Sequence, residues 1–258
     1  MEKNRSELKE QIQQADKILV GIGGEFEDKG WKNTALYEAY ESRKAQKEEW
    51  MPAYIRACYD RERADERLRT AYQNIAALLQ GRDYFVITLQ SDSYARHSGL
   101  EADRIAAPCG DSRYLQCENN CSHRLVLAEK ELESFADGLM EGKKQIKRMR
   151  CPDCGAGMNI NRYPQEHYCE DGYLEQWNSY REWVAGTMNR RIVLIEAGVD
   201  FTLPGIIRWP FEKMAFYNNK AYLFRIHERL SQISEELHGK ACAVPQNAVS
   251  FFAEMDVQ

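Results

Sequence analysis

The chain has 258 residues, of which 43% are hydrophobic and 29% are charged, as in a soluble globular protein with one large or two small domains. Its net charge of −5 argues against a protein whose main task is to coat nucleic acid or an anionic membrane. We expect no membrane span, because no apolar run approaches about 18 residues, and no signal peptide, because the N-terminus is charged and lacks an apolar core.

The first half of the chain predicts two buried strands separated by helices. Residues 6–16 have helical periodicity and lead into residues 17–24, a short apolar run that ends in glycines and is typical of a buried strand followed by a tight turn. Residues 34–79 are mostly helical in composition, with an interruption near Pro52. Residues 83–88, Asp-Tyr-Phe-Val-Ile-Thr, predict the second strand.

The second half adds a helical pattern at residues 174–184 and strands at residues 190–198 and 220–227, the last strand that we expect. Strands that alternate with helical patterns favour an α/β fold, with a Rossmann-like parallel sheet and helices on both faces.

Between these halves lies a cysteine-bearing segment, which divides the chain. We expect a discontinuous Rossmann-like domain over residues 1–108 and 172–258, and a small zinc-binding module over residues 109–171.

Two closely spaced cysteine pairs indicate a metal site. Cys117 and Cys121 are separated by three residues, and Cys151 and Cys154 by two. Two such pairs can supply the four thiolates of a closed tetrahedral zinc site, which leaves no open position for catalysis. His123 and Cys169 follow nearby as spare ligands, although an exposed histidine and a buried thiol are the simpler interpretation.

The cysteine usage also indicates the compartment. Eight cysteines in this length are too few for a disulfide scaffold, so we expect the reducing cytoplasm.

Five basic residues lie between the two cysteine pairs, in residues 142–150. Such a run can contact phosphate or nucleic acid. A solvated loop is the simpler interpretation in an acidic chain, and we do not expect a nucleic-acid partner.

The glycine turn after the first strand could let the backbone approach a pyrophosphate. Its sequence is Gly21-Ile22-Gly23-Gly24, but the full G-x-G-x-x-G pattern is absent, because Phe26 stands where the third glycine would be. An ordinary strand-to-loop turn is the better explanation of this fragment taken alone.

Four segments occur in order around the cysteine pairs: Gly21-Ile22-Gly23, Thr88-Leu89-Gln90-Ser91-Asp92, Cys109-Gly110 and Gly198-Val199-Asp200. This order resembles the sirtuins, a family of NAD-consuming protein deacylases and ADP-ribosyltransferases. The similarity is most specific to the macrodomain-linked subgroup, and the segments that carry it are residues 109–111, 115–117, 151–161 and 198–210.

The resemblance implies NAD as the cofactor, and it implies site residues at the matching positions. The implied catalytic residues are Gln90, Asp92 and Cys109. The implied cofactor-binding residues are Gly21, Gly23, Gly24, Phe26, Gln90, Asp92, Gly198, Val199 and His227.

Several of these positions depart from the family's pattern. Phe26 only approximates the phenylalanine of the first loop, and no arginine follows it. Gln90 replaces an asparagine, and His227 replaces the late asparagine that contacts the adenosine ribose. Cys109 occupies the position of the general-base histidine of the deacylases.

The chemistry assigns these residues different tasks. Asp92 matches the carboxylate that accepts the nicotinamide carboxamide N–H, although it could also cap a helix. A thiol is a poor base unless its pKa is lowered, so Cys109 could instead be a small buried residue.

We therefore expect an enzyme that cleaves NAD and transfers ADP-ribose to a protein. One alternative is an NAD-dependent deacylase, and another is a non-catalytic relative that binds ADP-ribose or a protein partner. The linked subgroup modifies a lipoyl-carrier protein, which makes such a protein a possible substrate.

A second His-Gly motif lies near the end of the chain. Glu236-Leu237-His238-Gly239 spells the catalytic motif of the deacylases, but it follows the last expected strand. We interpret His238 as a C-terminal helix residue before a capping glycine.

Overall fold

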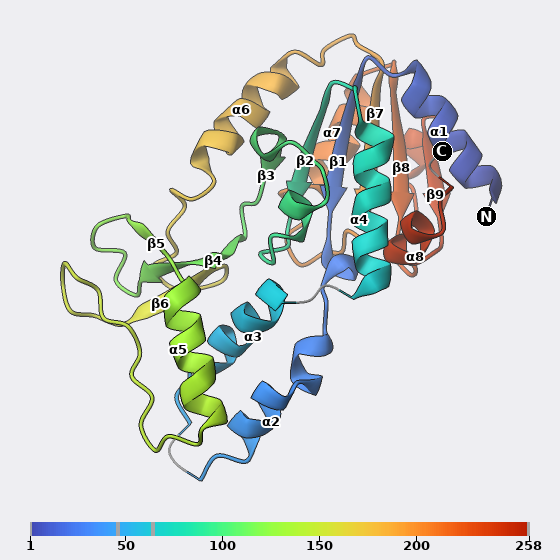
Figure 1. Ribbon diagram of the computed structural model, residues 1–258. Helices are drawn as coiled ribbons and strands as arrows, with labels where there is room; N and C mark the ends of the chain where they lie inside the picture. The colour runs from blue at the N-terminus through green and yellow to red at the C-terminus, as the bar shows by residue number, and fades with distance from the viewer. Residues whose placement is uncertain (1, 45–46, 63–64, 257–258) are drawn as a thin grey trace.

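The computed structural model describes residues 2–44, 47–62 and 65–256, and a six-stranded parallel sheet forms its centre (Figure 1). The strand order is β3-β2-β1-β7-β8-β9, and all neighbouring strands pair in parallel. The strands are β1 (Lys17–Ile22), β2 (Tyr84–Thr88), β3 (Ile105–Ala106), β7 (Ile192–Ala197), β8 (Ala221–Ile226) and β9 (Ala241–Val244). The predicted α/β fold is confirmed.

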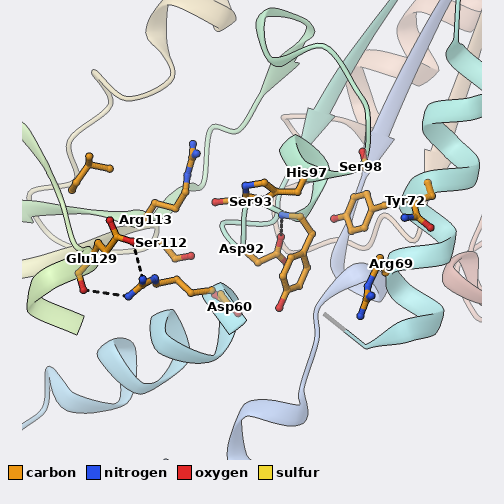
Figure 2. A pocket seen from close by; sticks show the side chains of 14 residues that line it. Asp60, Arg69, Tyr72, Asp92, Ser93, His97, Ser98, Ser112, Arg113 and Glu129 are labelled. Atoms are coloured by element: carbon orange, nitrogen blue, oxygen red, sulfur yellow. Dashed lines mark hydrogen bonds and ion pairs between the residues drawn. The ribbon is translucent and has the colours of Figure 1, made fainter. Parts of the chain in front are cut away.

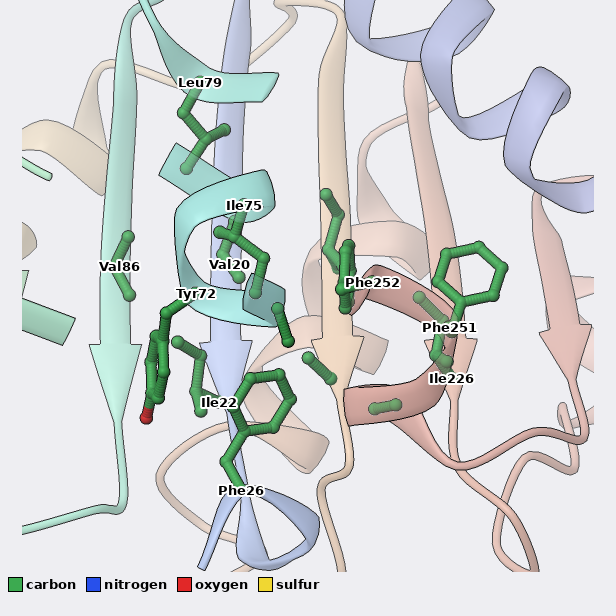
Figure 3. Packing of buried hydrophobic residues seen from close by; sticks show 14 of the residues in the cluster. Val20, Ile22, Phe26, Tyr72, Ile75, Leu79, Val86, Ile226, Phe251 and Phe252 are labelled. Atoms are coloured by element: carbon green, nitrogen blue, oxygen red, sulfur yellow. The ribbon is translucent and has the colours of Figure 1, made fainter. Parts of the chain in front are cut away.

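Helices cover both faces of this sheet, which explains why its central strands are almost continuously apolar. One hydrophobic cluster joins α1, α4 and α8 to the sheet, and Figure 3 shows Ile75 and Leu79 of α4 over Val20 and Val86. A second cluster joins α6 and α7 to the opposite face. The helices are α1 (Glu2–Gln14), α2 (Ala35–Glu41), α3 (Met51–Glu62), α4 (Glu66–Leu79), α5 (Glu129–Met140), α6 (Leu174–Ala185), α7 (Arg208–Tyr217) and α8 (Ala248–Ala253).

A smaller lobe lies beyond the carboxyl ends of the parallel strands (Figure 1). Its antiparallel sheet has the order β5-β4-β6, from β5 (Leu125–Leu127), β4 (Gly110–Cys117) and β6 (Met158–Arg162). Helices α2, α3 and α5 pack against this sheet in a third hydrophobic cluster, where the Tyr54 hydroxyl of α3 donates to the Met158 carbonyl at 2.9 Å. Residues from before β2 therefore share the core of the small lobe, while the domain boundaries at residues 109 and 171 stay a prediction.

The crevice between β1 and β7 is the place where the sheet order reverses, and open α/β sheets bind ligands at such a position. The loops after these two strands touch. A Cβ atom on Gly23 would lie 2.4 Å from Val199 Cα, so only glycine permits the approach. The Gly23 N–H donates to the Ala197 carbonyl at 2.9 Å, which joins the two strand ends.

A buried ion pair supports the loop after β7. Arg225 of β8 donates to both carboxylate oxygens of Glu196 at 2.6 and 2.9 Å, and both side chains are almost fully buried. Arg208 lies 3.9 Å from the same carboxylate and donates to the Val199 carbonyl at 3.2 Å. The pair thereby connects the sheet core to the loop that faces the crevice.

The structure corrects the expected elements in three respects. The strand at residues 220–227 is not the last, since β9 follows it at the sheet edge, and the two-residue strand β3 was not expected. The helical stretch over residues 34–79 is divided into α2, α3 and α4. That stretch includes residues 45–46 and 63–64, which lie outside the described residues.

Among the described residues, no helix combines the length and the apolar character that crossing a bilayer would require.

Candidate functional site

A cleft of about 590 Å³ separates the two lobes, and Figure 2 shows the side chains that line it. Its lining comes from α3 and α5, from α4, from the loop after β2 and from β4 and β5. The lining residues are Asp60, Arg61, Arg69, Tyr72, Gln73, Asp92, Ser93, Tyr94, His97, Ser98, Ser112, Arg113, Leu127 and Glu129.

Asp92 reaches this cleft from the loop that follows β2, and it is only 3% exposed. Its Oδ1 accepts a hydrogen bond from the Tyr94 N–H at 3.1 Å, which closes a local turn before a 3₁₀ helix (Tyr94–His97) whose N-cap residue is Ser93 and not Asp92. Its Oδ2 is buried and has no hydrogen-bond partner among the described residues. This turn therefore accounts for one oxygen and leaves the other available to a ligand.

The environment of Asp92 favours its protonated form. Burial raises the pKa of Asp92 to about 7, and the negative charge of Asp60 adds to this rise. The backbone hydrogen bond from Tyr94 and the charges of Arg56 and Arg162 oppose it, but they do not cancel the cost of burial.

A second cleft, of about 420 Å³, contains Gln90 and Cys109. The Gln90 amide donates to the Gly23 carbonyl at 2.8 Å and so bridges the ends of β2 and β1. Burial raises the pKa of Cys109 to about 11, even though the charge of Arg162 opposes the rise. The thiol is therefore protonated near neutral pH.

The three glycines at the end of β1, Gly21 within the strand and Gly23 and Gly24 after it, have different surroundings. A Cβ atom on Gly21 would lie 2.3 Å from Ile207 Cγ2, so Gly21 packs against the chain rather than facing the crevice. Gly23 packs against Gly198 and Val199 as described above. Gly24 lines the second cleft, where Asp200 faces it.

Two of the expected cofactor-binding side chains lie in the core. Phe26 is fully buried and packs edge-on against Tyr72, with a distance of 5.0 Å between ring centroids (Figure 3). Val199 is 1% exposed and belongs to the second hydrophobic cluster. Their side chains contribute packing, and their contact with a cofactor stays a prediction.

Gly198 and His227 lie together at the ends of β7 and β8, with Glu25 between them. Gly198 has a φ of +67°, and a Cβ atom there would lie 2.5 Å from Glu25 Cβ. Glu25 Oε1 lies 3.2 Å from His227 Nδ1, which accepts the N–H groups of Arg229 and Leu230. Sequence reasoning placed Gly198 and His227 in one site but did not single out Glu25 as their neighbour.

The four cysteines converge as their spacing predicted. Their sulfur atoms all lie within 4.8 Å of one another, with 3.5 Å between Cys117 and Cys154 and 3.6 Å between Cys121 and Cys151. Four sulfurs bound tetrahedrally at about 2.3 Å lie about 3.8 Å apart, so the arrangement fits a zinc ion. These residues could hold a metal ion.

His123 and Cys169 stand outside this group. His123 is exposed, and its Nδ1 lies 3.2 Å from Asp171 Oδ2. The buried Cys169 thiol donates to the same carboxylate oxygen at 3.4 Å. The simpler interpretation of both residues therefore agrees with their surroundings.

Two further sequence motifs contribute to neither cleft. His238 ends a short 3₁₀ helix, and Gly239 follows it with a φ of +80°. In the basic stretch, Arg148 pairs with Glu118 at 2.9 Å and donates to the Met158 carbonyl at 2.8 Å.

Sequence reasoning missed most of the residues that line the clefts, among them Asp60, Tyr72 and Arg162. Asp60 and Tyr72 face the first cleft from α3 and α4, and Arg162 lies at the end of β6 in the second. Asp60 and Tyr72 lie within helical patterns, where no sequence signal marks a residue as facing a cleft between lobes.

Two curated proteins with similar names match this chain at low sequence identity. No family model matches the chain. The chain is 27% identical over 143 residues to a Fusarium oxysporum f. sp. cubense protein named "Probable bifunctional ADP-ribose hydrolase/ADP-ribosyltransferase", a match that covers 52% of this chain and 24% of that protein. It is 21% identical over 179 residues to a Staphylococcus aureus (strain Mu50) protein named "Protein ADP-ribosyltransferase", covering 67% of this chain and 56% of that protein. The chain thus spans about a quarter of one relative and about half of the other.

Solved structures of Sir2 proteins match almost the whole chain. Sir2Tm bound to a propionylated peptide gives a TM-score of 0.58 at 11% identity, covering 96% of this chain and 94% of that chain. The complex of Sir2 with a p53 peptide and NAD⁺ gives a TM-score of 0.54 at 13% identity, with the same coverage of 96% and 94%. The chain therefore has the sirtuin fold, and the predicted resemblance is confirmed at the level of the fold.

The cysteine cluster predicts that the purified protein contains about one zinc ion per chain. Replacing Cys151 or Cys154 with Ser is expected to release the metal and unfold the small lobe, because metal binding contributes folding free energy. Elemental analysis and circular dichroism measure both effects. Cys242→Ser, on β9, is the control that keeps the metal. A fully folded wild-type protein without metal would contradict the prediction.

The environment of Asp92 predicts a pH-dependent cost in stability. An unfolded Asp has a pKa near 3.9, whereas Asp92 titrates near 7, so between these values the folded protein holds a proton that the unfolded chain has released. The contribution of Asp92 to stability therefore falls as pH rises from 4 to 7, by up to about 4 kcal/mol. Relative to wild type, Asp92→Asn is expected to raise the free energy of unfolding at pH 8 and to lose this advantage near pH 4.

Urea denaturation at both pH values measures this difference. Asp103→Asn, at an exposed carboxylate, is the matched control. If Asp92→Asn raises the free energy of unfolding by the same amount at both pH values, the raised pKa of Asp92 is contradicted.

Proposed function

We propose that the protein binds NAD in the crevice between its lobes and transfers the ADP-ribose group to a protein acceptor. The observation that carries this proposal is the buried, unpartnered Oδ2 of Asp92. A buried acceptor without a partner costs folding free energy, so its retention favours a ligand that supplies an N–H group. The nicotinamide carboxamide has that group.

NAD supplies the chemistry, since cleavage of its bond from nicotinamide to ribose releases nicotinamide and makes ADP-ribose available to an acceptor. Asp92 holds the carboxamide in the first cleft, and Gln90 orients the neighbouring ribose from the second cleft, where its amide is anchored on the Gly23 carbonyl. Gly24, Gly198 and His227 hold the remainder of the nucleotide at the ends of β1, β7 and β8.

The protonated state of the Cys109 thiol favours transfer of ADP-ribose over deacylation. Deacylation by a sirtuin-like site needs a base for a ribose hydroxyl, and a thiol with a pKa of about 11 holds its proton at neutral pH. Transfer to an acceptor that is activated by its own surroundings does not need that base. Cys109 then fills space beside Gln90.

The comparisons support a protein acceptor. Both curated relatives are named as ADP-ribosyltransferases, and the Sir2 structures contain peptides. A lipoyl-carrier protein is the acceptor that we propose to test first. The zinc ion would be structural, because four thiolates close its coordination.

One observation favours a second candidate, a relative that binds ADP-ribose without turnover. The Glu25 carboxylate accepts the N–H groups of Glu228 and Ala248 at 2.9 and 2.7 Å, beside Gly198 and His227. The negative charge of Glu25 repels a diphosphate group. Glu25 also occupies two backbone N–H donors that a bound nucleotide could otherwise use.

Asp92→Asn separates the two candidates. If Asp92 holds the carboxamide, this variant keeps ADP-ribose binding and releases nicotinamide more slowly, by about ten- to a hundredfold, because a hydrogen bond to a charged group contributes about 1.5–3 kcal/mol. Nicotinamide release from NAD, with and without acceptor protein, measures this effect. A wild-type protein that binds NAD but releases no nicotinamide under these conditions would establish the non-catalytic candidate.

Cys109 variants test the type of reaction. Cys109→Ala is expected to keep most of the transfer activity, because the protonated thiol does not act as a base. Cys109→His is expected to introduce deacylation of an acetyl-lysine peptide, which wild type lacks. A loss of a hundredfold or more in Cys109→Ala would show instead that the thiol is the base.

A further inference from the structure

The basic stretch between the two cysteine pairs forms one wall of a cavity in the small lobe. The cavity has a volume of about 680 Å³, within the range of about 300–1,000 Å³ that is typical of ligand pockets. It lies where the segment between α5 and β6 follows the outer edge of the small lobe, away from the parallel sheet (Figure 1). Its charged lining consists of five cations and one carboxylate: Arg43, Lys144, Lys147, Arg148, Arg150 and Glu48.

We infer that this basic cavity docks an acidic segment of the acceptor protein, at a site that shares no lining residue with either cleft between the lobes. That the partner is the acceptor rests on the proposed function. The acidic character of the docked segment rests on the cavity alone.

The basic segment is anchored to the small lobe and is not a loose loop. Arg43, which follows α2, donates to the carbonyls of Lys143 and Lys144 at 2.8 and 2.7 Å. Ile146 packs against the third hydrophobic cluster, and Arg148 donates to a backbone carbonyl of β6 at 2.8 Å. These contacts fix the backbone from which the cationic side chains project, so less conformational entropy is lost when a ligand binds.

Charged donors in the cavity remain available to a ligand. Lys144 and Lys147 are exposed and form no ion pair among the described residues, whereas Arg148 pairs with Glu118 at 2.9 Å. Arg43 Nε is buried and has no hydrogen-bond partner in the described part of the chain. In a chain with a net charge of −5, cations without carboxylate partners in one cavity indicate that the carboxylates come from a ligand.

Trp50 gives the cavity an apolar surface beside these cations. Its ring packs edge-on against Tyr54, with 4.7 Å between ring centroids, and lies 5.4 Å from Phe135, so α3 and α5 fix its orientation. Trp50 stays half-buried and lines the cavity together with Ile146. An occupant with apolar as well as anionic groups matches this lining better than a simple anion does, and a peptide segment has both.

A protein segment also fits the charge pattern better than a nucleic acid does. A second cavity, of about 540 Å³, contains Trp50 as well. Its lining includes three carboxylates, from Glu48, Glu49 and Glu118. The basic region therefore ends after one cavity, whereas a nucleic acid backbone follows a continuous basic groove.

Fluorescence anisotropy with the full chain and a labelled acidic peptide, composed of four Glu and two Leu residues, tests the inference. Wild type is expected to bind this peptide at least about tenfold more tightly than the same peptide with Gln in place of Glu. Lys144→Glu/Lys147→Glu is expected to weaken binding of the acidic peptide at least about tenfold, because each reversal replaces attraction with repulsion. High salt is expected to weaken wild-type binding.

A double variant with the same net charge is the matched control. Lys3→Glu/Lys213→Glu changes two exposed lysines on α1 and α7, in the lobe of the parallel sheet. It is expected to keep the wild-type affinity for the acidic peptide. If Lys144→Glu/Lys147→Glu fails to fold, Lys144→Gln/Lys147→Gln removes both charges without adding new ones and is expected to weaken binding about threefold.

The transfer assay tests whether the docked segment belongs to the acceptor. The unlabelled acidic peptide is expected to raise the KM for the acceptor protein without lowering kcat, because it competes for the cavity and leaves both clefts open. Nicotinamide release from NAD without acceptor is expected to be insensitive to the peptide.

The outcomes separate this inference from the proposed function. Equal binding of the acidic and the Gln peptide, or an equal loss of affinity in both double variants, overturns the inference. Tighter binding of a twelve-nucleotide single-stranded DNA than of the acidic peptide also overturns it, in favour of a nucleic-acid site. An unchanged KM in the presence of bound peptide overturns the assignment to the acceptor. Peptide binding by a protein that releases no nicotinamide overturns the proposed function and leaves the acidic preference of the cavity standing.

Discussion

The contact between the backbone of Gly23 and that of Gly198 and Val199 joins the loops that carry the strand-end part of the candidate site. It brings the loops after β1 and β7 together at the point where the sheet order reverses, and it needs a residue without a Cβ atom. Gln90 is anchored on the Gly23 carbonyl, and Glu25 packs against Gly198. The buried ion pair between Glu196 and Arg225 lies in the sheet core and supports the loop after β7.

The site differs from the rest of the interior in how its polar groups are satisfied. Glu196 and Arg225 are as deeply buried as Asp92, but they satisfy each other with two hydrogen bonds. Asp92 keeps its Oδ2 without a hydrogen-bond partner among the described residues. Folded proteins depart from full pairing chiefly where function requires it, which makes this oxygen the strongest mark of a functional site in the interior.

The sequence predicted the elements whose local pattern is strong and missed those that depend on tertiary packing. Four strands of the parallel sheet were predicted because each is a nearly continuous apolar run, whereas Ile105–Ala106 is too short and Ala241–Val244 too weakly apolar to signal a strand. Cysteine spacing was sufficient for the metal cluster, since its members are close in the chain as well as in space.

The remainder of the site could not be predicted because it depends on how elements distant in the chain pack together. Asp92 was found through a family motif, but its unpaired oxygen depends on neighbours from other elements. Asp60 and Tyr72 come from helices without any such motif, and a helical pattern does not show that α3 packs on the small lobe while α4 packs on the parallel sheet.

That division of α3 and α4 between the lobes has a mechanical consequence. Asp60 lies on α3, which packs on the small lobe, whereas Tyr72 and Asp92 belong to the lobe of the parallel sheet, and the chain passes between the lobes after β1, α3, β3 and β6. A ligand in the cleft that contacts both Asp60 and Asp92 would therefore connect the two lobes directly. Binding and release of such a ligand would then be coupled to the angle between the lobes, and so to the width of the cleft between them.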